Sequence, residues 1–285
     1  MSSPPTPLLL LAGGVAVADA ALRGWRPARK AIPSNLLFLS IAWLPFFALP
    51  HVGPRTVTGI AALLGLLAML DFSRVVGLSR HGRFFVPAFT LTAACFPIAA
   101  LHQGALLSAV PAVALLGLAA ASAGWKAQDG FLQKLALSWL AVLVYGYLYA
   151  HAVLFAHATW PTLPGPTMLA LVILLAKFAN VAWLAVRRLT PRHRVHLVVT
   201  PLAGFAGGKI VGALWPAVGI AYLTALGSAI GLGLAVGLRA HTMIVADVTA
   251  EPERLRKGTM IFGFGLALAV GYWVLSFVTT PTWSN

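Results

Sequence analysis

The chain has 285 residues, of which 60% are hydrophobic and only 9% are charged. Soluble domains carry roughly 25% charged residues, so this composition excludes a water-soluble globular fold. A formal net charge of +14 would suit a nucleic-acid-binding protein. Here, however, the basic residues lie in short segments between apolar runs, which is typical of membrane proteins, and we expect no nucleic-acid partner. A single cysteine, Cys95, excludes a disulfide framework and a cysteine-based metal site.

Long apolar stretches recur along the whole chain, rich in Leu, Ala, Val and Gly and without strand-like alternation. Helices satisfy their own backbone hydrogen bonds, so they are the expected spanning elements. The sequence therefore predicts an all-α polytopic integral membrane protein with about nine or ten transmembrane helices. The third stretch is short, and the eighth or ninth could be re-entrant or tilted because only Trp215-Pro216 separates them. The predicted spans lie at about 7–22, 34–50, 56–70, 84–102, 105–123, 135–157, 166–186, 197–215, 217–238 and 259–279.

The distribution of lysine and arginine predicts the orientation. Most of the 20 basic residues fall in alternate loops, and Lys177 and Lys209 fall within spans. The positive-inside rule then predicts an inner (cytoplasmic) membrane protein with the basic loops cytoplasmic and both termini outside. The charges either merely orient the helices or also attract anionic lipid headgroups, at about 1 kcal/mol per basic residue. The basic loops are 23–34, 71–83, 124–134, 187–196 and 239–258.

The acidic residues are few and are predicted to lie outside the middle of the membrane. Asp19 precedes Arg23 by four residues and Asp71 precedes Arg74 by three, which favours ion pairs at helix ends near the cytoplasmic surface. With no carboxylate expected at mid-membrane depth, the sequence argues against a proton relay built on Asp or Glu.

Lys177 is the first candidate functional residue. It lies about ten residues, or roughly 15 Å, before the predicted cytoplasmic end of its helix, a long reach for snorkelling. Asn180 follows at i+3 on the same helix face. An ionisable group inside the membrane is a functional hypothesis by default. The alternative is a lysine bonded to backbone carbonyls in the interior of the bundle.

The segments after Lys177 supply further candidate phosphate-binding residues. Basic side chains there could grip phosphate groups, and the glycines would permit close helix packing or approach of the backbone to a ligand. The basic residues of the second cytoplasmic segment could equally belong to a solvated loop. These candidates are Arg188, Arg192, His193, Arg194, Thr200, Gly207, Gly208, Arg256 and Lys257.

In order and spacing, these motifs resemble the phosphatidate cytidylyltransferase (CDP-diacylglycerol synthase) family. That family has an Asn-Asp pair, a basic loop, Ser-Pro-x-Lys-Thr-x-Glu-Gly and a Gly-Gly, which Asn180, Arg192-His193-Arg194, Thr200-Pro201 and Gly207-Gly208 follow here. Arg256-Lys257-Gly258 and Gly263-Phe264-Gly265 correspond to later family anchors. The resemblance implies a phosphatidate cytidylyltransferase-like bundle. It divides the chain into N-terminal transmembrane helices, 1–123, and a family-like region, 124–285.

The chain departs from the family where the family has acids. The family joins CTP to phosphatidate with release of pyrophosphate, and its divalent metal, Mg²⁺, requires carboxylate ligands. The Lys-Thr of the first motif is also absent. Without those carboxylates no cofactor is expected with certainty, and Mg²⁺ is expected only if the chain is active. At the family's acidic positions stand Asn180, Ala203, Thr242, Arg256, Ala269 and Tyr272.

Three functions remain open on these grounds. The first is a pseudoenzyme of phospholipid metabolism that binds phosphatidate, another anionic lipid or CTP, alone, as a homodimer or as the accessory subunit of an active enzyme. The second is an active nucleotidyltransferase with relocated metal ligands, drawn from Asp247, Glu251 and Glu253. The third is a lipid or small-solute transporter that uses Lys177 and the glycine-rich helices.

Overall fold

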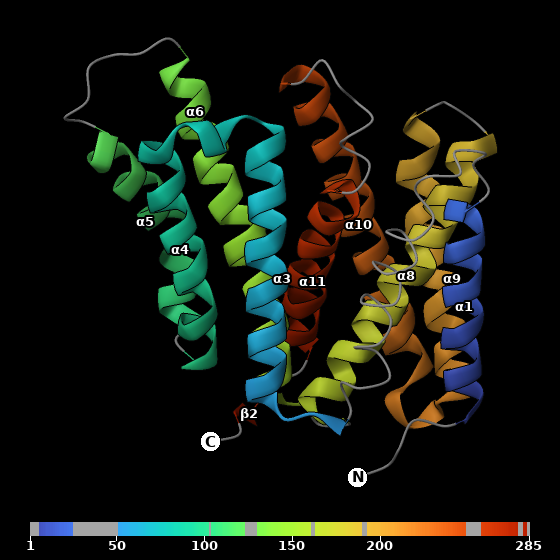
Figure 1. Cartoon of the computed structure of the whole chain (residues 1–285). Coiled ribbons are helices and arrows are strands. Elements are labelled where there is room, and N and C mark those ends of the chain that lie inside the picture. Colours follow the sequence, from blue (N-terminus) through green and yellow to red (C-terminus); the bar gives the residue numbers. More distant parts are fainter. Residues whose placement is uncertain are drawn as a thin grey trace. The chain divides into compact units, whose positions relative to one another are not determined.

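The computed structural model is almost entirely helical (Figure 1). It describes residues 6–24, 51–102, 104–122, 130–160, 163–189, 193–248, 258–278 and 282–283, so the predicted span at 34–50 lies outside the described residues. The helices are α1 (Thr6–Gly24), α3 (Pro54–Val75), η2 (Leu78–Arg80), α4 (Gly82–Ala100), α5 (Gly104–Ser122), α6 (Phe131–Ala141), η3 (Val142–Leu148), α7 (Tyr149–His157), α8 (Gly165–Leu189), α9 (His193–Leu214), η4 (Pro216–Val218), α10 (Ile220–Val248) and α11 (Gly258–Val278). The strands β1 (Ala158–Thr159) and β2 (Thr282–Trp283) form one short antiparallel pair.

Among the described residues, seven helical segments are long and apolar enough to cross a bilayer, and the chain is an all-α multi-pass membrane protein. The third predicted stretch is longer than expected, because α3 continues to Val75. The eighth and ninth stretches are both full-length helices, separated by Trp215 and the short η4 turn. The seven segments are Pro54–Val75, Gly82–Ala100, Ala105–Ser122, Phe131–His157, Gly165–Val186, Val195–Leu214 and Ile220–Ile244.

The helices pack into two compact units that interleave along the sequence. Unit 1 contains the described residues of Met1–Gly53, Ala158–Val236 and Val270–Asn285, and unit 2 contains those of Pro54–His157 and Gly237–Ala269. The motif-based boundary at residue 123 therefore falls within unit 2. The division into 1–123 and 124–285 concerns where the family-like motifs begin, and it stays a prediction.

Unit 2 is built around the segment that runs through α6, η3 and α7. Its central portion, η3, is π-helical, and this widened turn holds the side chain of Tyr145 in the interior against Phe72, with ring centroids 5.4 Å apart. A Cβ on Gly146 would lie 2.9 Å from Cys95 Sγ, so only glycine allows α4 to approach this closely. Single π-helical turns in α-helices are uncommon and often occur at functional sites.

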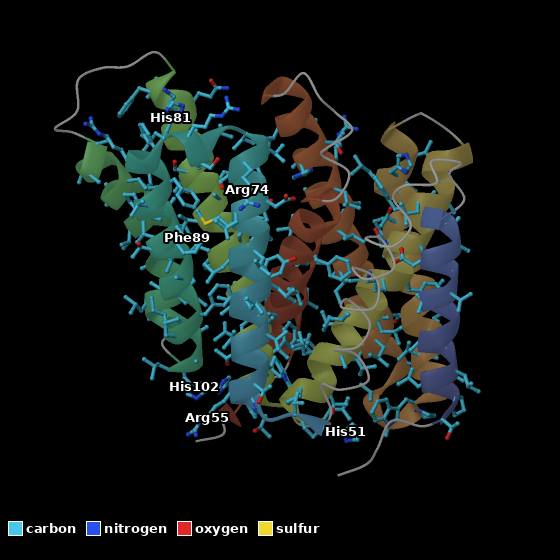
Figure 2. The ribbon with its side chains drawn as sticks, in the orientation of Figure 1. His51, Arg55, Arg74, His81, Phe89 and His102 are labelled. Carbon is cyan, nitrogen blue, oxygen red and sulfur yellow. The ribbon has the colours of Figure 1, made fainter. Side chains whose placement is uncertain are left out.

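Arginine and histidine side chains of unit 2 lie at both ends of its helices. Arg74 and His81 lie at one end, and Arg55 and His102 lie at the other (Figure 2). This separation agrees with the assignment of 71–83 and Arg55 to loops on opposite sides of the membrane.

Unit 1 places α8 beside both α1 and α9 (Figure 1). Helices α9 and α10 approach each other more closely than a side chain at their glycine positions would allow. A Cβ on Gly204 would meet the carbonyl of Gly227, and one on Gly208 would meet the carbonyl of Leu223. Small residues let transmembrane helices bring their backbones together in this way. The glycines of α9 thus allow this helix to pack tightly against α10, beside α8.

The glycine contacts predict a packing defect on substitution. A Cβ on Gly231 of α10 would lie 2.6 Å from the carbonyl oxygen of Thr200, whereas one on Gly117 of α5 would meet nothing within 4 Å. Gly231→Ala should lower the midpoint of thermal unfolding in detergent, because overpacking typically costs about 1–3 kcal/mol. Gly117→Ala is the matched control, since both substitutions gain helix propensity. Equal unfolding midpoints for the two variants would contradict the close contact between α9 and α10.

Candidate functional site

A buried polar cluster joins α1 to α8. The ammonium nitrogen of Lys177 lies 3.4 Å from Oδ2 of Asp19, and the side-chain amide of Asn180 donates a hydrogen bond of 3.2 Å to Oδ1 of the same carboxylate. Exposure is 0% for Asp19 and 1% for each of Lys177 and Asn180. Each oxygen of the Asp19 carboxylate therefore accepts from a donor on α8.

The cluster lies at the middle of a long transmembrane helix. Lys177 is the midpoint of α8, about 18 Å from each end of that helix at a rise of 1.5 Å per residue. Asn180 is one turn further on, so both donors project from one face of α8. Asp19 reaches them from α1, five residues before the end of that helix at Gly24.

The local sequence explains why α1 presents its carboxylate to α8. Leu8, Ala12, Val15 and Asp19 are all buried, and they recur at intervals of four, three and four residues. This spacing forms a single stripe along a helix. Leu10, on the opposite side of α1, is 72% exposed. Asp19 thus occupies an interior position in an otherwise apolar stripe.

The expected role of Asp19 is wrong in one important respect. It was predicted to form a helix-end pair near the cytoplasmic surface, whereas its carboxylate is buried against the lysine at the midpoint of α8. The expectation that no carboxylate lies deep among the spans fails with it. The described partners of Asp19 are about 160 residues away in the chain. The side chain of Arg23, the expected local partner, is outside the described part of the structure. The available sequence signal was the position of Asp19 on the stripe with Leu8, Ala12 and Val15.

Helix α9 also packs against α8 and carries small and polar residues. Thr200 is buried, and the buried His196 ring packs on Trp183 of α8 with centroids 5.4 Å apart. A Cβ on Gly207 would lie 3.0 Å from the ring of Phe178 on α8. Gly208 instead faces Leu223 of α10. Of the predicted site residues, Lys177 and Asn180 form the cluster with Asp19. Thr200, Gly207 and Gly208 belong to the neighbouring helix α9.

The remaining predicted site residues lie at the ends of α8 and α9 or outside the described residues. Arg188 lies near the C-terminal end of α8, and His193 and Arg194 begin α9, so their backbones occupy the facing ends of these two helices. The side chains of these three residues are outside the described part of the structure. Arg192, Arg256 and Lys257 lie outside the described residues altogether.

The described residues do not fit the divalent metal that the family resemblance implies. Mg²⁺ prefers several oxygen ligands in octahedral geometry. The one carboxylate of this cluster already accepts from Asn180 and contacts the positive charge of Lys177, which would repel a cation. Within the described ranges, His, Cys, Asp and Glu nowhere gather in the groups of three or more that could hold a metal ion.

No protein-family model, no curated protein and no solved structure matches this chain. The function of the cluster must therefore be inferred from its own chemistry. Ionisable residues deep among transmembrane helices are rare and usually paired, and they commonly mark ligand, ion or proton sites. Pairing offsets only part of the cost of desolvating the two charges.

The contacts of Lys177 predict its effect on stability. Lys177→Gln should lower the midpoint of thermal unfolding substantially, because removing one partner of a buried ion pair costs about 3–5 kcal/mol. The double variant Asp19→Asn/Lys177→Gln should recover part of this loss, since it leaves no uncompensated charge. Lys209→Gln is the control, because Lys209 is exposed on α9, where its ammonium lies over the ring of Phe205. If the single and double variants unfold at the same temperature, the pair does not have the assigned electrostatic role.

Proposed function

We propose that this chain is a phosphatidate cytidylyltransferase-like membrane protein of phospholipid metabolism that has lost catalysis and binds an anionic lipid or nucleotide. The observation that carries the proposal is the engagement of the Asp19 carboxylate by Asn180 and Lys177. Asn180 stands at a position where the resembled family has an acid. A lysine supplies positive charge beside it where a metal-dependent enzyme would need a divalent cation.

The charges in the cluster disfavour metal-dependent group transfer. The carboxylate and the ammonium neutralise each other, so the cluster holds no surplus negative charge with which to attract Mg²⁺. Beyond Lys177, the sequence carries Arg188, Arg192 and Arg194. Such cations attract anionic headgroups at about 1 kcal/mol each. The proposed ligand is therefore phosphatidate, a related anionic lipid or CTP, bound by the chain alone or as an accessory subunit of an active enzyme.

The proposal predicts binding without turnover. Purified full-length protein with labelled CTP, phosphatidate and Mg²⁺ should form no CDP-lipid, yet it should bind phosphatidate or CTP saturably and without a metal requirement. Arg192→Ala and Arg194→Ala should each weaken binding several-fold, at about 1 kcal/mol per lost charge. Arg55→Ala is the matched control.

Formation of CDP-lipid that is abolished by Asp247→Asn or Glu251→Gln would overturn the proposal that the chain has lost catalysis, and would favour an active enzyme. Binding that is unchanged in both Arg192→Ala and Arg194→Ala would contradict the proposal that these arginines attract the anionic ligand.

The proposed orientation, with the basic loops cytoplasmic, predicts one-sided labelling. In a Cys95→Ala background, Arg55→Cys should react with a membrane-impermeant maleimide in intact cells, and Arg80→Cys should react only after permeabilisation. Arg55 is at the start of α3, and Arg80 ends η2 beyond the opposite end of that helix. Labelling in the reverse pattern would invert the topology.

A further inference from the structure

Lys209 is a basic residue on the outer surface of a membrane-spanning helix. It lies within the apolar segment Val195–Leu214, and its side chain is exposed. Within the described part of the chain, no carboxylate pairs with its ammonium, which lies 4.9 Å from the centroid of the Phe205 ring, one helical turn back. An aromatic ring attracts a cation but does not neutralise its charge. A cation on the surface of a span is costly in lipid unless an anion meets it.

The exposed face of α9 forms an apolar stripe that ends at this ammonium. Val198 and Leu202 are each 60% exposed, and Phe205 is 40% exposed. From Val198 to Lys209 these residues recur at intervals of four, three and four, which places them on one side of the helix. Gly204, whose close contact is with α10, lies on the opposite side. The stripe therefore points away from the contact between α9 and α10.

The composition of the stripe favours a lipid over a partner helix as its occupant. Helices that pack against each other in membranes do so through small residues, which let their backbones approach. Helix α9 meets this condition on its glycine face, which contacts α10. The side chains of Val198, Leu202 and Phe205 are large, and they present hydrocarbon surface to acyl chains. The stripe therefore has the chemistry of a lipid-facing surface, with a positive charge at one end.

Aromatic residues place Lys209 close to one membrane surface. Lys209 is five residues, or about 7.5 Å, before the end of α9 at Leu214. Trp215 follows directly, and Tyr222 lies in the first turn of α10. Tryptophan and tyrosine gather at the level of the lipid headgroups. A lysine side chain is long enough to cover most of the distance to that level, while its stem stays on the apolar surface.

We propose that Lys209 binds the phosphate group of an anionic phospholipid whose acyl chains lie along Val198, Leu202 and Phe205. The ammonium has three N–H donors, and the ring of Phe205 covers only one side of it, so donors remain for phosphate oxygens. The cation and the apolar stripe follow each other along the helix in the same order as the two parts of a lipid. A zwitterionic lipid brings its own cation, which the ammonium repels, so the site selects a net negative charge.

This site is separate from the segment to which the proposed function assigns its ligand. Arg194 is the second residue of α9, whereas Lys209 lies fifteen residues, or about 22 Å, further along the same helix. The two positions therefore belong to opposite ends of the span. The inference goes beyond the proposed function and does not rest on it, so either can fail alone.

Site-specific photo-crosslinking in a bilayer tests the site. Full-length protein carrying Leu202→p-benzoylphenylalanine would be reconstituted in nanodiscs of phosphatidylglycerol and phosphatidylcholine in equal amounts and with the same acyl chains. Leu202 lies about two turns before Lys209 on the stripe, beside the acyl chains of the proposed lipid. After illumination, mass spectrometry should find about fivefold more phosphatidylglycerol than phosphatidylcholine on the peptide, which is the attraction that one basic residue near the surface exerts on an anionic lipid.

Variants of Lys209 and a second crosslinking position provide the controls. Lys209→Gln should abolish the preference for phosphatidylglycerol, and Lys209→Arg should retain it because the charge is kept. Both variants should fold as wild type, since the side chain is exposed. Leu10→p-benzoylphenylalanine is the matched position, because Leu10 is exposed on α1 and the first 22 residues contain no Lys or Arg. Crosslinks from Leu10 should show no preference between the two lipids.

Three results would overturn the lipid site. They are equal yields of the two lipids at Leu202, a preference that persists in Lys209→Gln, and a preference at Leu10 as large as that at Leu202. Crosslinks from Leu202 to a second protein chain in place of lipid would also overturn it, because a partner helix would then cover the stripe. Each of these results leaves the proposed function standing, since none concerns binding by Arg192 and Arg194.

Discussion

The contact between Asp19 and Lys177 is the interaction on which the arrangement of α1 and α8 depends. A lysine at the midpoint of a 25-residue apolar helix cannot readily extend its ammonium to either membrane surface. Its charge must therefore be met inside the protein, and α1 supplies the carboxylate. Asn180 then fixes the second carboxylate oxygen. The facing positions of α1 and α8 and the pairing of these two buried charges thus have a common electrostatic cause.

Small residues determine how closely the helices around α8 approach one another. The glycines of α9 bring its backbone against α10, and Gly207 lets the ring of Phe178 on α8 pack close to α9. These contacts are dense and leave little freedom for rearrangement. Among the described side chains of α1, the buried ones lie along one stripe, and Asp19 is the last of them.

Much of the fold follows from the sequence, because long apolar runs without charges must be helices in a membrane. The prediction at 135–157 matches the segment from Phe131 to His157 closely, although nothing in its composition indicated that Val142–Leu148 would be π-helical. Lys177 was identifiable because a charge inside an apolar span is conspicuous. The role of Asp19 was missed because a plausible local partner, Arg23, hid a contact that only the folded chain creates. The resemblance to the cytidylyltransferase family stays a prediction.

Infrared difference spectroscopy of the carboxyl C=O stretch measures most directly whether Asp19 is the internal counter-ion of Lys177. The carboxylate band that is lost in Asp19→Asn should shift in Lys177→Gln and stay in place in Lys209→Gln. A band at the same position in Lys177→Gln and Lys209→Gln would contradict the pairing of Asp19 with Lys177.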